Sequence, residues 1–374
     1  MEKKVKLAVI GGFLGAGKTT TILSLAKLLI AQGKKIGIVT NDQGSSLVDT
    51  AYLKEHGLPV LEVAGGCFCC NFDEFTKTVN KLAADELPDI ILAEPVGSCT
   101  DLVATIFRPF QLRRAAEFSM SPLVSVIDPR RGLKLMAGGG GFQNEINYLF
   151  KKQLEEADII LVNKTDKYEK SEIAELEDYL KREFPAAVRS VSAKDEKTLL
   201  PLLPVLLGEE AQAGEIMELD YDTYALAEDL LGWYNGNCSL DGQADIKVFT
   251  QSFFDGARRF VKEKDRDIAH LKAHIITSGG HMKASLTSVE DDTEFDEASF
   301  KYAGSASMVI NARVNIGPEE LGPALTESLY SAARQCGIEI SGYRYDCFKP
   351  GRPSEAARER MHSDEVYCCC CKKN

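Results

Sequence analysis

No apolar run in this sequence approaches the roughly 20 residues that a helix needs to cross a bilayer. Basic residues are fewer than acidic ones: the chain has 44 Lys and Arg against 56 Asp and Glu, so its net charge is −12. Nucleic acid and anionic lipid would repel such a charge. The apolar residues 5–10 are followed by a glycine loop and by no small-residue cleavage site, so they predict a first β-strand rather than a signal peptide. We therefore expect a cytoplasmic protein with no membrane and no nucleic-acid partner.

Cysteine, by contrast, is plentiful in a chain of otherwise ordinary composition, with 44% apolar and 27% charged residues. Disulfides are unexpected inside the cell, so the eleven cysteines need another explanation. Seven of them form two clusters, one at Cys67, Cys69 and Cys70 and one at residues 368–371. Clustering favours metal or redox chemistry over packing. The others are expected to be small apolar residues in or near cores: Cys99, Cys238, Cys336 and Cys347.

The first part of the chain alternates short β-branched runs with amphipathic helical patterns. Strands are predicted at residues 5–10, 35–40, 90–93, 123–127 and 159–162, with a weaker one at 187–191. Helices are predicted between them at residues 19–31, 72–84, 144–156 and 171–183. Repeated βαβ units indicate an α/β fold, a mostly parallel sheet with helices on both faces. We assign this domain to residues 1–210.

The pattern changes after a polar stretch at residues 208–214. It becomes a strand at 230–240, a long helix at 246–261, two alternating runs that meet at the turn 279–280, a strand at 308–316, a helix at 318–336 and a last run at 338–343. This predicts a smaller α+β domain of roughly βαβββαβ order at residues 215–346. A charged, apolar-poor and cysteine-rich tail is expected to be flexible at residues 347–374.

Residues 12–19, GFLGAGKT, match the phosphate-binding pattern GxxxxGK(S/T) in full, after a strand and before a helix. In that setting backbone N–H groups at the helix N-terminus hold phosphates. Lys18 reaches the β- and γ-phosphate oxygens, and Thr19 ligates Mg²⁺. The residues assigned to phosphate binding are Gly12, Gly15, Ala16, Gly17, Lys18, Thr19 and Thr20.

Two later loops indicate that the base is guanine. Asn163, Lys164 and Asp166 lie in an Asn-Lys-Thr-Asp stretch after the strand at 159–162. The Asp166 carboxylate can accept the N1–H and the exocyclic amino group of guanine, a pair that adenine lacks. One βα unit later, the loop of Ser192, Ala193 and Lys194 can place a backbone N–H against guanine O6. The order of the two loops favours GTP over ATP.

Two further segments carry acids that suit the phosphate end of such a site. The strand at 90–93 ends in Glu94, which can hold Mg²⁺ through water, and the N–H of Gly97 can sense the γ-phosphate. Asp42 follows the second strand and is placed to act as a switch, with Asp49 as a second candidate.

The thiols of Cys67, Cys69 and Cys70 can converge on one ion if their loop curls, which the preceding glycines at 65–66 permit. Three thiolates suit Zn²⁺, Co²⁺ or Cu(I) and leave one position for water, a fourth side chain or a partner. A closed structural zinc site needs a fourth ligand, and the sequence identifies none. We interpret the cluster as a metal site, while a redox pair and incidental buried cysteines stay open.

Three other features have weaker implications. His270 and His274 lie four residues apart at the predicted end of the long helix, near His281, and we expect surface or capping histidines rather than a metal site. The acidic residues 290–297 predict a solvated loop rather than a cation site. The four cysteines at 368–371 can collect metal for the first cluster, be acylated or be dispensable.

With these motifs in place, the chain resembles the CobW-type GTPases, relatives of UreG, HypB and the chaperones of cobalamin-dependent mutases. The resemblance covers residues 5–207 and rests on segments 12–20, 65–70, 94–97 and 153–166. It implies a P-loop fold of the SIMIBI class and GTP hydrolysis coupled to delivery of zinc or cobalt, or to cobalamin metabolism. It also implies metal binding by the three cysteines near the γ-phosphate, a client metalloenzyme or corrinoid protein, and a nucleotide-dependent homodimer. The chain departs from the usual Asn-Glu-Phe-Gly switch at 41–44 and has no histidine-rich loop.

Three functions follow from these observations. The first is a slow GTPase and metallochaperone, in which Lys18, Thr19 and Mg²⁺ neutralise phosphate charge. There Glu94 and Asp42 organise metal and water, and Gly97 senses the γ-phosphate. The second is a GTP-gated chaperone of a corrinoid enzyme without metal transfer. The third is a metal- or redox-sensing regulator with negligible turnover.

Overall fold

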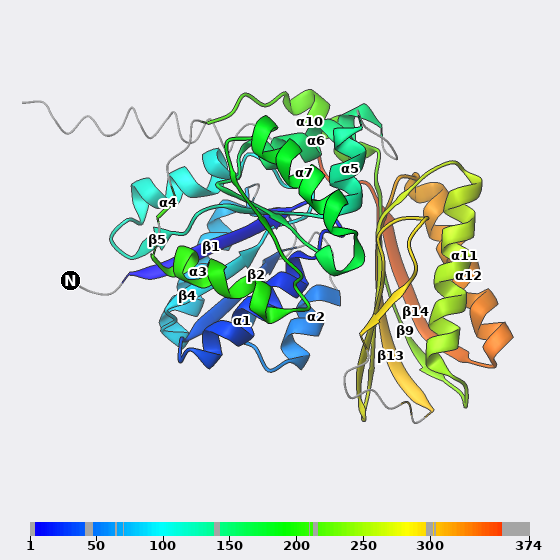
Figure 1. Ribbon diagram of the computed structural model, residues 1–374. Coiled ribbons are helices and arrows are strands. Elements are labelled where there is room, and N and C mark those ends of the chain that lie inside the picture. Colours follow the sequence, from blue (N-terminus) through cyan, green and yellow to red (C-terminus); the bar gives the residue numbers. More distant parts are fainter. Residues whose placement is uncertain are drawn as a thin grey trace, which may run out of the picture.

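The computed structural model describes residues 4–41, 48–63, 66–69, 71–137, 143–208, 210–211, 216–296, 302 and 304–353. The predictions for Asp42, Cys70 and the cysteines at 368–371 lie outside these residues. The described chain forms a parallel α/β domain followed by an antiparallel α+β domain, as predicted (Figure 1). Among the described residues, no helix is both long and apolar enough to cross a membrane.

The first domain is built on an eight-stranded sheet in which the paired strands run parallel. Along the sheet the order is β3 (Val60–Val63), β2 (Ile36–Asn41), β4 (Ile90–Glu94), β1 (Val5–Gly12), β6 (Val124–Ile127), β7 (Ile159–Val162) and β8 (Ala187–Ser190), with β5 (Phe118–Met120) also paired to β1. The sequence did not reveal β3 and β5, which are short. Because the strands run parallel, the loops after β1, β2, β3 and β4 meet at one edge of the sheet.

Helices cover both faces of this sheet, because alternate side chains of the buried strands are apolar in both directions. One apolar core lies under α1 (Lys18–Ala31), α2 (Val48–Glu55), α8 (Glu196–Leu199) and α9 (Leu203–Gly208). The other lies under α3 (Phe72–Glu86), α4 (Arg108–Arg113), α5 (Pro129–Met136), α6 (Asn144–Glu155), α7 (Lys170–Glu183) and α10 (Tyr221–Asp229). A π-helical turn, Val103–Phe107, leads into α4.

The second domain is a six-stranded antiparallel sheet with two helices. Its strand order is β12 (Glu294–Asp296), β11 (Gly280–Leu286), β10 (Ile268–Thr277), β13 (Ser305–Val314), β9 (Gly232–Asp241) and β14 (Glu339–Phe348). The helices are α11 (Ile246–Glu263) and α12 (Pro318–Cys336). The predicted order of elements is confirmed, with β12 added inside the acidic segment that the sequence suggested was a loop.

The two faces of this second sheet differ in chemistry. The apolar face packs against α11 and α12 and forms a separate core around Phe249, Phe253 and Met308. The opposite face carries polar side chains of β10, β11 and β13, among them Lys272, Lys283 and Asn311. Figure 1 shows the sheet between α11 and α12 on one side and the first domain on the other. The polar face therefore meets the first domain, where Asn311 Oδ1 accepts a hydrogen bond from the N–H of Val48 at the start of α2 (2.8 Å).

We predict that the core under α11 stabilises the second domain. Phe253 is fully buried in that core, so Phe253→Ala should lower the free energy of unfolding by about 3–5 kcal/mol. Val248, on the same helix, is 53% exposed, so Val248→Ala should change it by less than about 0.5 kcal/mol. Urea unfolding followed by circular dichroism measures both. Equal losses in the two variants would contradict this packing.

Candidate functional site

The loop between β1 and α1 has the backbone shape of a phosphate cradle. Gly12, Gly15 and Gly17 have φ values of 120°, 77° and 97°, which disfavour any residue with a side chain. A Cβ on Gly17 would also lie 2.4 Å from Asn163 Nδ2. The glycines thus let the chain turn into the N-terminus of α1, an arrangement that can bind a phosphate.

Lys18, Thr19 and Glu94 lie together at the floor of this cleft. The Lys18 ammonium is buried and donates to the carbonyl of Phe13 (3.3 Å), and burial lowers its pKa. The Thr19 hydroxyl donates to Glu94 Oε1 (3.0 Å). Glu94 Oε2 is buried and has no hydrogen-bond partner in the described part of the chain. An unsatisfied carboxylate oxygen beside a threonine hydroxyl fits a hydrated Mg²⁺, whose preferred ligands are oxygens.

Burial also affects the charge of Glu94. Desolvation, with added repulsion from Asp49, raises the pKa of the Glu94 carboxyl to about 7, while Lys18 opposes the rise. A divalent cation at this position would restore the ionised form, because it supplies the positive charge that the buried carboxylate needs.

The two predicted guanine loops are joined to each other and to the phosphate loop. Asn163 Nδ2 donates to the carbonyl of Ala16 (2.9 Å), and its Oδ1 accepts from the N–H of Ala193 (2.9 Å). The Ser192 hydroxyl donates to Asp166 Oδ1 (2.6 Å). These side chains line the same cleft as Lys18 and Thr19. The structure thus brings the sequence-predicted phosphate and base residues together in one site, which Thr20, Lys164 and Lys194 also line.

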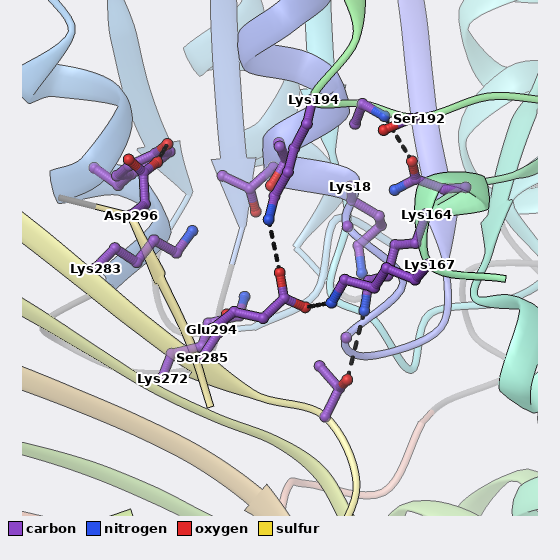
Figure 2. A pocket seen from close by; sticks show the side chains of 18 of the residues that line it. Lys18, Lys164, Lys167, Ser192, Lys194, Lys272, Lys283, Ser285, Glu294 and Asp296 are labelled. Carbon is purple, nitrogen blue, oxygen red and sulfur yellow. Dashed lines mark hydrogen bonds and ion pairs between the residues drawn. The ribbon is translucent and has the colours of Figure 1, made fainter. Parts of the chain in front are cut away.

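The second domain closes one side of this cleft. Glu294 of β12 forms ion pairs with Lys167 and Lys194, both on the guanine loops (Figure 2). Asp291 pairs with Arg130 of α5 (2.7 Å). The expectation of a solvated acidic loop was therefore wrong for Glu294 and Asp291, because basic residues of the first domain meet them. That contact joins segments 100 or more positions apart in sequence, which no local pattern reveals.

The loop after β4 presses against the phosphate loop. A Cβ on Gly97 would lie 2.6 Å from Leu14 Cδ2 and 3.0 Å from the Leu14 backbone nitrogen. Gly97 therefore lies beside the cradle, where the sequence placed a phosphate sensor. Asp49, the second switch candidate, lies in α2 and pairs with Lys272 of β10 and Lys283 of β11.

Three thiols meet at the same edge of the sheet. The Sγ atoms of Cys67, Cys69 and Cys99 all lie within 4.8 Å of one another, and the three residues are buried. Cys67 Sγ and Cys69 Sγ are 2.7 Å apart. In the described part of the chain, no other set of three or more His, Cys, Asp or Glu side chains brings its ligand atoms this close. Three soft donors in a compact, buried group fit Zn²⁺ or another thiophilic ion.

Sequence reasoning missed Cys99, which it treated as a packing residue. The signal was its position five residues after Glu94, the last residue of β4. In the sheet, β4 lies two strands away from β3, which leads into the cysteine loop. Cys99 thus supplies a thiol from a second loop. Gln153 Nε2 donates to the carbonyls of Gly97 (3.0 Å) and Cys99 (2.9 Å) and holds this loop in place.

A buried acid, Glu228, and a half-buried acid, Glu156, hold the residues on either side of Cys99. Ser98 Oγ donates to Glu228 Oε1 of α10 (2.7 Å), and Thr100 Oγ1 donates to Glu156 Oε1 (3.1 Å). Burial raises the pKa of both carboxyls to about 8. The Cys99 loop is therefore held by α10 and by the residue that follows α6.

Asn41 joins the cysteine loop to the end of β2. Its Nδ2 donates to the carbonyls of Val63 (2.8 Å) and Gly66 (2.7 Å), and its Oδ1 accepts from the N–H of Phe68 (2.9 Å). Asn41 also lines a cavity with Lys18 and Gly97. One carboxamide thus contacts both ends of the thiol loop and borders the phosphate end of the cleft.

The histidine prediction was wrong in its placement. His270 and His274 lie in β10, because α11 ends at Glu263 and Asp265 adopts a left-handed conformation, with φ 53°. Both histidines are buried rather than surface or capping residues. His274 lies near His281 of β11, with ring centroids 5.3 Å apart.

We predict a pH-dependent contribution from Glu156. Its pKa is about 8 in the folded chain and 4.5 in a model peptide, so between these values the folded state holds a proton that the unfolded state has lost. The free energy of unfolding should therefore fall as pH rises through this window, by at most about 1.4 kcal/mol per pH unit. Glu156→Gln should flatten that slope in urea unfolding at about pH 5.5–8. An unchanged slope in the variant would contradict the prediction.

Comparison with known proteins agrees with this geometry. Residues 6–188 match the family described as CobW/HypB/UreG, nucleotide-binding domain. The zinc chaperone CobW of Sinorhizobium sp is 31% identical over 226 residues, which are 54% of this chain and 62% of that protein. The zinc chaperone YeiR of Escherichia coli strain K12 is 34% identical over 166 residues, 42% of this chain and 46% of that protein. The matched part is thus less than two thirds of each relative.

The solved structures that match the chain are more distant in sequence. The Zn(II)-bound YjiA GTPase from E. coli is 14% identical, with a TM-score of 0.37, over 87% of this chain and 98% of that chain. HypB from Helicobacter pylori in complex with nickel is 19% identical, with a TM-score of 0.39, over 55% of this chain and 87% of that chain. Residues 6–188 thus carry a nucleotide-binding domain of the CobW/HypB/UreG type.

Proposed function

We propose that this protein is a GTPase that couples its nucleotide state to the binding of zinc and its delivery to a client metalloprotein. The observation that carries the proposal is the position of Asn41, which is hydrogen-bonded to the cysteine loop and borders the phosphate end of the cleft. A change at the phosphate end can therefore reach the thiols through one side chain. The names of the relatives CobW and YeiR, both zinc chaperones, favour zinc over cobalt as the cargo.

Hydrolysis of GTP would use the residues at the cleft floor. Lys18 neutralises charge on the β- and γ-phosphates, and the N–H groups of the loop hold their oxygens. Thr19 and Glu94 would hold Mg²⁺, which supplies charge neutralisation between the two phosphates. Gly97, packed on Leu14, is placed to register whether a γ-phosphate is present. Asp42 remains our proposed organiser of the attacking water.

Zinc as cargo would bind as follows. Cys67, Cys69 and Cys99 supply three thiolates, and binding releases their protons. Cys70 remains a proposed ligand from the same loop. Three described ligands leave a fourth position, and an incomplete coordination sphere suits an ion that must be passed on, because a ligand of the client can enter before the others leave. A client metalloprotein and nucleotide-dependent self-association are part of this proposal.

We predict that Cys99 is a metal ligand. Apparent binding free energies of zinc–thiolate sites are roughly 10–16 kcal/mol, so removing one thiolate should weaken zinc binding by about 100-fold or more. Anaerobic titration of Cys99→Ser against a chromophoric chelator measures this loss. Cys238→Ser is the matched control, because Cys238 is also buried but lies in the core of the second domain. Wild-type zinc affinity in Cys99→Ser would contradict the assignment.

We also predict that Asp166 selects guanine. Asp166→Asn replaces an acceptor oxygen by a donor amide, so the variant should lose about 10- to 100-fold in GTP affinity, as expected for hydrogen bonds to a charged group. Xanthosine triphosphate, whose C2 carries a carbonyl, should instead bind the variant better than it binds the wild type. Competition against a fluorescent nucleotide gives both affinities. If the variant kept the wild-type preference for GTP, Asp166 would not be the residue that recognises guanine.

A further inference from the structure

The polar face of the second sheet completes the phosphate end of the cleft. A cavity between the domains is lined by Lys18, Glu94 and Gly97 of the first domain. On its other side it is lined by Lys272 of β10 and Arg313 of β13. Lys272 also lines the main nucleotide cleft, as Lys18 does (Figure 2). The second domain thus faces the place where the terminal phosphate of GTP would lie.

Positive charge outnumbers negative charge around this cavity. Asp49 is shared by two lysines, with its carboxylate oxygens 2.5 Å from Lys272 Nζ and 3.2 Å from Lys283 Nζ. Lys18 is the third ammonium group, and Arg313 is fully buried. The guanidinium of Arg313 donates to backbone carbonyls and to Asn235, and it stacks over Trp233 at 4.0 Å.

Buried cations in such excess are costly unless an anion joins them. The described residues that line the nucleotide cleft include six lysines and four acids. Besides Glu94, these acids are Asp166 on a guanine loop and Glu294 and Asp296 on β12. Burial lowers the pKa of Lys18, and the charge of Lys272 acts in the same direction against the opposing charge of Glu94. A bound polyphosphate would relieve this repulsion.

We propose that Lys272 is a catalytic residue that binds the γ-phosphate of GTP, leaving Asp49 to Lys283 while the triphosphate is bound. The proposal rests on the function proposed above. During hydrolysis the oxygen of water bonds to the γ-phosphorus and the bond to the β–γ bridging oxygen breaks. GDP leaves with that oxygen, and the protons of water pass to the phosphate and solvent. Lys272 exchanges no proton; it stabilises the negative charge on the γ-oxygens, as a cation supplied from another domain does in other GTPases.

The exchange of partners would also connect the domains to the nucleotide. Asp49 lies in the first turn of α2, and the neighbouring Val48 N–H donates to Asn311 of β13. When GDP replaces GTP, Lys272 returns to Asp49 and strengthens the contact between α2 and β10. The second domain therefore senses the same phosphate as the cleft floor.

The test compares a non-hydrolysable GTP analogue with GDP, both with Mg²⁺, by calorimetry on the full chain. Lys272→Met should lower the affinity for the analogue by about 10-fold or more. It should lower the affinity for GDP by less than about 2-fold, because only the analogue carries the γ-phosphate. The single-turnover hydrolysis rate should fall by about 100-fold or more. Lys264→Met is the control, since Lys264 pairs with Glu320 on the surface of the same domain.

A structural role would give a different result. If Lys272 were only structural, Lys272→Met would lower the affinities for the analogue and for GDP equally and would lower the melting temperature. An analogue-to-GDP affinity ratio in Lys272→Met equal to that of the wild type overturns the proposal. Asp49→Asn removes the competing carboxylate and should raise this ratio; a lowered ratio would also count against the proposal. If the wild type hydrolyses no GTP, the proposed GTPase fails, whereas the affinity ratio still decides the role of Lys272.

Discussion

The carboxamide of Asn41 is the constraint on which this account depends. It lies at the end of β2, satisfies two carbonyls and one N–H around the cysteine loop, and borders the cavity at the phosphate end of the cleft. A buried amide with its donors and acceptor engaged cannot move without breaking several hydrogen bonds. The thiols and the phosphate cradle are therefore held in a fixed relation. A shift at either end breaks hydrogen bonds of Asn41 unless the other end moves as well.

The second domain supplies charged side chains to the nucleotide cleft. Its antiparallel sheet has one face sealed by α11 and α12, which frees the other face for polar side chains. Glu294 reaches the guanine loops from this domain, and Lys272 reaches the phosphate end. The nucleotide cleft is thus lined along its length by two domains, although a nucleotide-binding motif is found only in the first. A change in nucleotide would be felt across this interface as well as at the thiols.

Local patterns were enough to predict much of the site. The glycine loop, the Asn163–Asp166 stretch and the alternation of strands and helices each depend on neighbouring residues, so the parallel domain and its cleft could be predicted. Cys99, Glu294 and Lys272 could not, because their roles depend on contacts between strands and domains that are far apart in sequence. The histidines of β10 were misplaced for a related reason: their four-residue spacing suits a helix, but the register of the sheet decides which face they occupy.

The most direct test of the coupling is the affinity of the thiol site for Zn²⁺ in two nucleotide states. Anaerobic protein would be titrated with zinc in the presence of a non-hydrolysable GTP analogue or of GDP, for the wild type and for Asn41→Ala. We expect wild-type zinc affinities that differ by about 5-fold or more, a typical allosteric coupling, and a much smaller difference in Asn41→Ala. Equal zinc affinities in the two nucleotide states of the wild type would contradict the account.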